Sequence, residues 1–165
     1  MNLSFSLYRL QKIDTQRQKI TQRIVQIEAE LAADEAVQAC LKVKEQAEHE
    51  LKQTQSKLRD IAQQVAAKRM KLELNQNQLF GGKIRNPKDL QDLQAEADFL
   101  RKSIQELEDL QLEVMLELEI AQRNLEEAEE AYQQRLSNRA TQASLLLGEK
   151  HQFENDLTGL NAQRE

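Results

Sequence analysis

The sequence predicts an all-α protein that folds as a long antiparallel coiled-coil helical hairpin. Charged residues make up 31% of the 165 residues and aromatic residues only 4%, with no tryptophan. This composition is typical of a long helix or coiled coil rather than of a globular domain. Apolar residues recur at helical spacing along almost the whole chain. A single turn-forming stretch lies at the midpoint of the chain, where the only proline stands beside Gly81-Gly82.

Residues 1–79 are predicted to form the first arm. From Leu3 to Leu31 the apolar residues alternate in steps of three and four, as at the a and d positions of a heptad, with Arg17 as an exception. The frame then slips by three residues, and Asp34 is suited to cap a new helix. We therefore expect a kink or break near residues 32–36.

Beyond the break the first arm keeps a steady frame as far as Leu79. One strong row recurs at every seventh residue: Leu51, Leu58, Val65, Leu72 and Leu79. The companion row that we assign beside it is weaker: Leu41, Glu48, Gln55, Ala62, Arg69 and Gln76. One strong and one mixed row indicate a seam against a single partner helix.

Residues 80–86 are predicted to form the loop at the hairpin tip. Gly81-Gly82 can adopt positive φ and stop a helix. Asn86 suits the N-cap position and Pro87 the first position of the next helix. Asp89 places a carboxylate in the first turn, where the helix dipole favours a negative charge.

Residues 87–165 are predicted to form the second arm, and its two apolar rows predict the register of the hairpin. One row runs from Leu90 to Tyr132 and the other from Leu93 to Ala128. Folding at the tip sets the rows opposite those of the first arm, in the pairs Leu79–Leu90, Leu72–Ala97, Val65–Ile104, Ala62–Leu107 and Gln55–Val114.

The register of the distal coil, formed by residues 1–31 and 135–165, is left open by the sequence. One frame continues through Arg139, Leu146 and Phe153, and it sets Arg17 against Glu149. A shifted frame fits about equally well, through Leu136, Ala143, Leu147 and Leu157.

The residues that usually carry catalysis or bind metals are sparse. Cys40 is the only cysteine, so no internal disulfide can form, and it is expected to be a small packing residue. His49 and His151 lack further ligands at helical spacing. No nucleophile–base pair or phosphate loop is present. We expect a protein that is not an enzyme, holds no metal or cofactor in this chain, does not enter membranes and is cytoplasmic.

The first candidate binding surface is basic and lies at the tip. It comprises Lys83, Arg85 and Lys88, with Arg69 nearby. A positive tip can contact phosphate groups or an acidic protein surface. The alternative is ordinary charge scatter around a solvated loop. Because no aromatic stacking platform is recognised beside these residues and the net charge is −5, general nucleic-acid binding is not expected of the hairpin.

The second candidate surface is apolar and lies on the second arm. It comprises Leu112, Met115, Leu116 and Ile120, which fall outside the predicted seam. An exposed apolar stripe often marks an interface, here with a second copy or a partner helix. The alternative is an error in the frame, or a local thickening of the hairpin. The surrounding stretch, residues 106–130, carries ten acidic residues against one arginine.

The tip also carries a family resemblance. The stretch from Phe80 to Glu96, FGGKIRNPKDLQDLQAE, resembles the hairpin signature of bacterial C4-type zinc-ribbon proteins with a long N-terminal coiled coil. The opening LYRLQKID, from Leu7 to Asp14, is similar to that family as well. The Asn-Pro-Lys-Asp-Leu-Gln core is the most specific part, because any coiled coil shares the heptads.

The resemblance implies a helical hairpin followed by a small ribbon in which two CxxC pairs hold zinc. No CxxC pair occurs in these 165 residues, so the family's zinc and nucleic-acid contacts cannot be assigned to any position here. The hairpin is expected to serve as the coiled-coil half of a non-enzymatic adaptor or regulatory protein that binds a protein partner, with nucleic acid contacted through the ribbon. The alternative is a purely structural or chaperone-like coiled coil.

Overall fold

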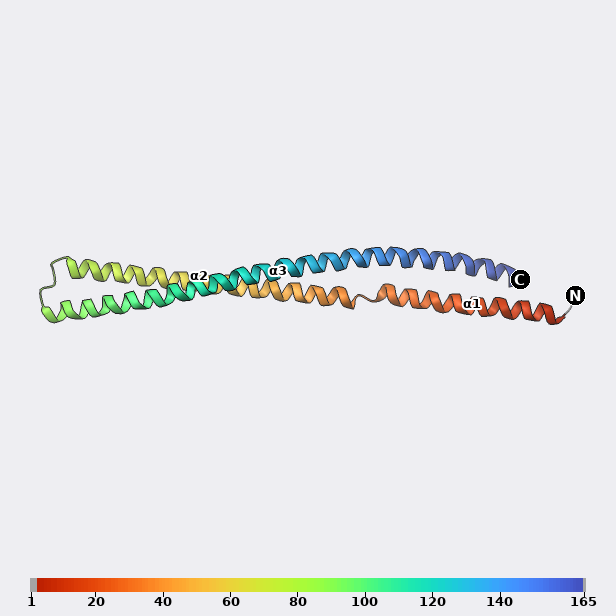
Figure 1. Ribbon diagram of the computed structural model, residues 1–165, viewed down its shortest axis with the longest axis horizontal. Helices are drawn as coiled ribbons and strands as arrows, with labels where there is room; N and C mark the ends of the chain where they lie inside the picture. Colours follow the sequence, from red (N-terminus) through yellow and green to blue (C-terminus); the bar gives the residue numbers. More distant parts are fainter. Residues whose placement is uncertain (1–2, 165) are drawn as a thin grey trace. The chain divides into compact units, whose positions relative to one another are not determined.

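The computed structural model describes residues 3–164 and confirms the all-α helical hairpin (Figure 1). Helix α1 spans Leu3–Ala32, α2 spans Glu35–Phe80 and α3 spans Pro87–Arg164. No strand occurs within the described residues. Met1, Asn2 and Glu165, which the predicted arms include, lie outside them.

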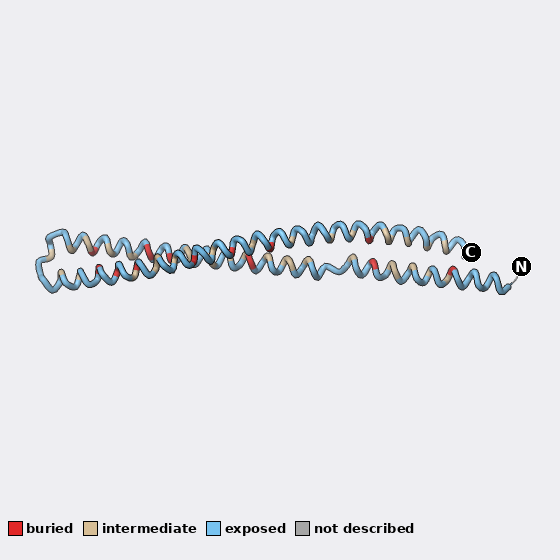
Figure 2. The backbone as a smooth tube through the Cα atoms, in the orientation of Figure 1, coloured by how far each residue is buried: buried red, intermediate tan, exposed pale blue. Residues whose placement is uncertain are grey.

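The chain divides into two compact units. One unit comprises Met1–Lys42 with Glu130–Glu165, and the other comprises Val43–Glu129. Within each unit a segment of α3 packs against a segment of the first arm. Buried residues are few and recur at intervals along each helix, as Figure 2 shows, because only one side of each helix faces its partner.

The core of the second unit is a small apolar cluster. Ile61, Val65 and Val114 are buried together, and Leu58 and Leu107 pack against them. Val114 is fully buried. Burial of each such side chain stabilises the fold by about 1.5–3 kcal/mol. The predicted register is therefore wrong in detail, since Val114 was expected opposite Gln55, which is exposed.

The error comes from the companion row of α2. The strong row from Leu51 to Leu79 lies in the seam as predicted, but the second row of seam residues stands one position earlier in the sequence than the companion row that was assigned to it. Ile61 is buried, whereas Ala62 is exposed. The same shift brings into the seam Ala47, Thr54, Lys68 and Asn75, and it leaves outside Gln55 and Arg69. Isoleucine buries more apolar surface than alanine, which favours the observed frame.

Asn75 is a buried polar residue in this seam. Its amide Nδ2 donates hydrogen bonds to the Leu93 carbonyl at 3.1 Å and to Glu96 Oε2 at 3.2 Å. Its Oδ1 has no partner among the described residues. A polar side chain in a coiled-coil seam favours one register, because a slipped helix would lose its hydrogen bonds.

In the first unit, α1 packs against the C-terminal part of α3, with Ile13, Ile27 and Leu146 buried. Both predicted frames of the distal coil contribute to this seam. Leu146, Phe153 and Leu160 come from the first frame and are at least half-buried, as are Ala143 and Leu157 from the shifted frame. By contrast, Leu136 and Leu147 of the shifted frame are exposed.

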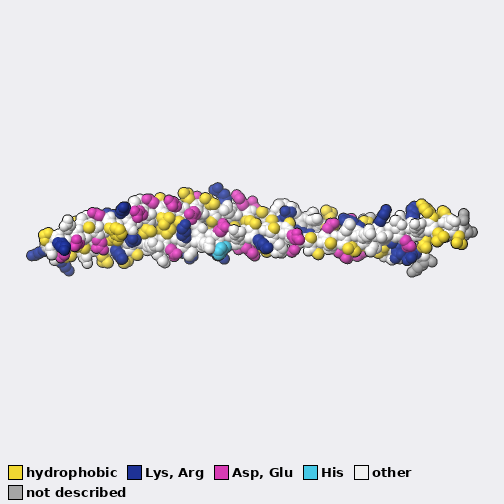
Figure 3. Space-filling view, turned by 90° about the horizontal axis from the view of Figure 1, so that it is seen from below, with side chains coloured by type: hydrophobic (Ala, Val, Ile, Leu, Met, Phe, Trp, Pro, Cys, Tyr) yellow, Lys and Arg dark blue, Asp and Glu magenta, His cyan; other side chains and the backbone are white. Residues whose placement is uncertain are grey.

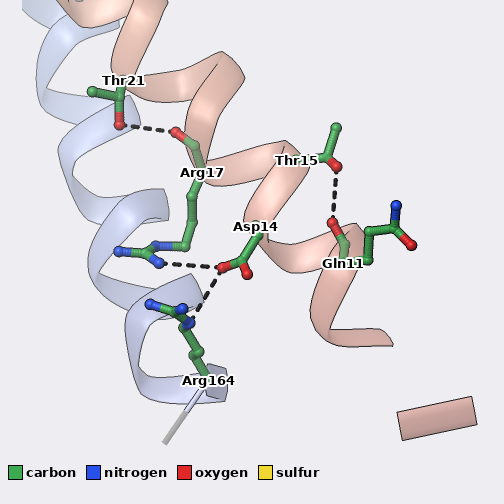
Figure 4. A network of polar contacts seen from close by, with 6 residues as sticks. All are labelled: Gln11, Asp14, Thr15, Arg17, Thr21 and Arg164. Atoms are coloured by element: carbon green, nitrogen blue, oxygen red, sulfur yellow. Dashed lines mark hydrogen bonds and ion pairs between the residues drawn. The ribbon is translucent and has the colours of Figure 1, made fainter. Parts of the chain in front are cut away.

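The ion pairs of this unit correct the expected contact between Arg17 and Glu149. Arg23 instead pairs with the Glu149 carboxylate, and its Nε lies 2.9 Å from Oε1 and its Nη2 lies 3.1 Å from Oε2. Arg17 instead contacts Asp14 at 3.4 Å, and Arg164 reaches the same carboxylate at 3.2 Å (Figure 4). Two arginines from facing helices thus share one acid, while the buried Nε of Arg17 is unpaired among the described residues.

The predicted break is confirmed at Ala33 and Asp34, between α1 and α2. The Asp34 carbonyl accepts the first hydrogen bond of α2, from the Gln38 amide at 3.0 Å. On the other side of the break, the Arg139 guanidinium of α3 donates to the Glu30 carbonyl at 3.0 Å and to the Leu31 carbonyl. These carbonyls lie in the last turn of α1, where the intrahelical partners run out.

The register of the second unit can be tested with two neighbouring substitutions. Ile61→Ala is expected to lower the free energy of unfolding by about 2–5 kcal/mol, because it removes a buried side chain from the cluster. Ala62→Lys is expected to change it by no more than about 0.5 kcal/mol, because position 62 is exposed. Urea unfolding followed by circular dichroism measures both, and a larger loss for Ala62→Lys would support the register predicted from sequence.

Acid is expected to weaken the first unit through Glu149. The hydrogen bonds from Arg23 lower the pKa of Glu149 below its ordinary value of 4.5. A depressed pKa in the folded state means that the stabilisation is present above pH 4.5 and is lost as the pH falls through the folded value. Thermal melts between pH 7 and pH 2.5 should therefore show a smaller acid-induced drop in Tm for Glu149→Gln than for the wild type. Equal drops would show that this pair contributes nothing to the pH dependence.

Candidate interaction surfaces

The loop at the tip depends on both of its glycines. Helix α2 continues one residue further than predicted, to Phe80, and α3 begins at Pro87. A Cβ atom on Gly81 would lie 2.6 Å from the Asn77 carbonyl oxygen, too close for any other residue without a backbone shift. Gly82 has φ of 71°, a conformation that other residues rarely adopt.

Asn86 caps α3 as the sequence predicts. Its Oδ1 accepts a hydrogen bond from the Lys88 amide at 3.0 Å, and its carbonyl accepts one from the Leu90 amide at 3.1 Å. Pro87 takes the first helical position, where no amide donor is needed. These local contacts orient the first turn of α3, and Lys88 with it.

Three of the four predicted basic residues remain free at the tip. Lys83, Arg85 and Lys88 are exposed, and their side chains form no ion pair within residues 3–164. We call these three residues the basic tip; lysine and arginine side chains gather at this end of the molecule in Figure 3. Arg69 is different, because it lies on α2 and is paired with Glu108 of α3. It therefore belongs to the hairpin's own contacts.

Exposed aromatic side chains are the part of this surface that sequence analysis missed. Phe80 has an exposed fraction of 79% and directly precedes the loop. It follows the last seam residue, Leu79, and so points away from the partner helix; this position was the available signal. Phe99 has an exposed fraction of 67%, and the Lys68 ammonium lies 6.0 Å from its ring centroid.

The predicted apolar residues of α3 lie outside the seam. The exposed fractions of Leu112, Leu116 and Ile120 are 61%, 62% and 58%. We call these three residues, at four-residue spacing, the outer stripe; Met115 lies beside it with an exposed fraction of 42%. Residues four apart occupy neighbouring places on one side of a helix, so the stripe is continuous.

Acidic side chains border the outer stripe. Glu113 and Glu119 are exposed and form no ion pair with any described residue. Glu117 is paired instead with Lys57 of α2, at 3.1 Å. The stripe is therefore an apolar surface in a negative surround, on the same unit as the basic tip.

The candidate metal ligands do not come together. In the part of the chain that the structure describes, no group of three histidine, cysteine, aspartate or glutamate side chains is arranged to hold a metal ion. His49 and His151 are exposed, and Cys40 is half-buried with a free thiol. None of the described helices has the length and apolar character that crossing a membrane requires.

The paired helices, the glycine-containing tip and the heptad seam together define a coiled-coil hairpin protein. The chain matches the CT398-like coiled coil hairpin domain over residues 10–165, and it belongs to that family. No curated protein and no solved structure gives a match. The family match covers the hairpin part of the resemblance described above, while the zinc ribbon stays a prediction from the tip motif.

Two glycine substitutions test the conformation of the tip. Gly82→Ala is expected to destabilise the hairpin by about 1 kcal/mol or more, because alanine is strained at positive φ. Gly159→Ala is the matched control, since Gly159 lies within α3 and a Cβ there meets nothing within 4 Å. It should stabilise the protein by about 0.5–1 kcal/mol. Thermal unfolding measures both, and equal signs would contradict the assigned tip conformation.

Proposed function

We propose that the chain is a non-enzymatic adaptor whose coiled-coil hairpin presents binding surfaces to protein partners. The observation that carries this proposal is the basic tip, where three unpaired cations stand beside the exposed Phe80. Some cations along the helices are paired with carboxylates instead, as Lys57 and Arg69 are. Arginine and aromatic residues are enriched in protein interfaces, and Arg85 and Phe80 supply one of each at the tip.

The expected partner surface is acidic and offers an apolar pocket. Complementary charge accelerates encounter and fixes orientation, and an aromatic anchor contributes affinity once it is desolvated. The fold suits this role, because the Asn86 cap orients the first turn of α3, which carries Lys88. A preorganised surface loses less conformational entropy on binding than a mobile one.

A role in nucleic-acid binding is proposed for a zinc ribbon of the parent protein, and not for the hairpin. Support comes from the resemblance of the tip motif to C4-type zinc-ribbon proteins. The ten acidic residues of the stretch 106–130 would repel phosphate groups. In this proposal the hairpin docks a protein in the bacterial cytoplasm while the ribbon contacts nucleic acid, which makes the parent protein a regulatory adaptor.

Charge reversal at the tip tests the adaptor proposal. Immobilised wild-type chain and the variant Lys83→Glu/Arg85→Glu/Lys88→Glu are incubated with nuclease-treated lysate of the source organism. A protein captured by the wild type is expected to be reduced by about tenfold or more with the variant, which corresponds to about 1.4 kcal/mol of binding free energy. The matched control, Lys42→Glu/Lys52→Glu/Arg59→Glu, changes three exposed cations of α2 by the same total charge.

Equal capture by the wild type and the tip variant would remove the tip from the proposal. The structural or chaperone-like alternative makes a different prediction: both proteins would suppress the aggregation of an unrelated unfolded substrate to the same extent. Circular dichroism establishes first that each variant retains the helix content of the wild type.

A further inference from the structure

We propose that the basic tip and the outer stripe also bind each other, between two copies of the chain. In this homodimer the units of residues 43–129 lie antiparallel, and the basic tip of each copy contacts the outer stripe of the other. The inference rests on the proposed function in that it assigns a partner, a second copy, to the same surfaces. Three properties of the unit argue for this occupant.

The first property is charge complementarity within one unit. The basic tip carries three cations without an ion pair in the described chain, and the outer stripe is bordered by Glu113 and Glu119, which are also unpaired there. The tip and the stripe lie on one unit, yet they are separated along α3 and cannot neutralise each other within one copy. Contact between two copies would pair both sets of charges, and complementary potentials of this kind steer association.

The second property is the arrangement of exposed apolar side chains. Phe99 precedes Ile120 by three heptads, so the two residues occupy the same side of α3 in a coiled coil. Phe99, Leu112, Leu116 and Ile120 are all more than half exposed. An antiparallel neighbour along this side would bury them together, and the removal of apolar surface from water drives association.

The third property is symmetry. Lys88 and Leu116 both lie on α3, about 42 Å apart along the helix at 1.5 Å per residue. A two-fold axis that crosses α3 midway between these two residues places the basic tip of each copy on the outer stripe of the other, because each contact in such an interface occurs twice. This axis passes between Phe99 and Glu106, and it brings the two exposed Phe99 side chains close together. One symmetric arrangement therefore gives the basic tip, the outer stripe and Phe99 each a contact in the second copy.

Sedimentation equilibrium of the full chain tests the dimer. The wild type is expected to dimerise at micromolar concentration, and more weakly as salt is raised, because exposed charges are screened. The variant Leu112→Asp/Leu116→Asp is expected to be monomeric. Leu145→Asp is the control, since Leu145 is similarly exposed on α3 but lies in the other unit. A monomeric wild type, or a stripe variant that still dimerises, would overturn the inference.

A charge swap distinguishes this pairing from other modes of dimerisation. Lys83→Glu/Arg85→Glu/Lys88→Glu and Glu113→Lys/Glu119→Lys should each weaken the dimer by about tenfold or more, which corresponds to at least about 1.4 kcal/mol. An equimolar mixture of the two variants should dimerise again, because in the mixed dimer each reversed surface meets the reversed surface of the other chain, and one chain carrying all five substitutions should also dimerise again. Failure of that chain to recover dimerisation, with its helix content intact, would overturn the proposed pairing.

Site-specific cross-linking tests the geometry. In a Cys40→Ser background, a chain with Lys88→Cys is mixed with a chain with Leu116→Cys and treated with a short bis-maleimide reagent. Links between the two kinds of chain are expected, and links predominantly between two Lys88→Cys chains would overturn the antiparallel arrangement.

The inference and the proposed function fail separately. A monomeric chain that still captures a protein through its tip would overturn the self-association and leave the adaptor proposal standing. If the chain forms the symmetric dimer but the tip variant captures the same proteins as the wild type, the adaptor proposal is overturned and the self-association stands.

Discussion

The narrow seam between two helices is the constraint on which this structure depends. Within each unit the core is the line of contact between two helix faces, and no further layer of described residues covers it. The cluster of Ile61, Val65 and Val114 is therefore as central as this fold allows. Only one side of each helix can be buried in the seam. Apolar residues on the remaining sides are left in solvent, which explains why so many large hydrophobic side chains are exposed.

The same constraint governs the polar residues that do enter the seam. Asn75 and Lys68 lie within or beside it, and both reach partners on α3, in Leu93, Glu96 and Ser103. A two-helix seam is never far from water, so a long side chain such as lysine can pack its stem and extend its charged end outward. Polar seam residues weaken burial, but they discriminate against slipped registers, which a uniform row of leucines would not.

Sequence periodicity was sufficient to predict the hairpin, the break near Asp34 and the tip, because each has a strong local signal. The register was less accessible. The row from Leu51 to Leu79 is compatible with two alternative companion rows, and Ile61 is the one large apolar residue that distinguishes the observed row from the predicted one between these positions. The Arg23–Glu149 pair could not be predicted, since a charge-rich helix offers many equivalent acids. The outer stripe could be predicted because its residues lie outside the heptad seam, and the exposure of Phe80 was accessible in the same way, since Phe80 directly follows the seam residue Leu79.

The contact of Arg139 with the end of α1 has a kinetic consequence. The carbonyls of Glu30 and Leu31 accept hydrogen bonds from a side chain of α3, so the C-terminus of α1 is stabilised by a facing helix and not by a residue in its own chain segment. Fraying of that end requires α1 to separate from α3. Amide protons in the last turn of α1 are therefore expected to exchange when the contact with α3 opens, and not by local fraying at the break between α1 and α2.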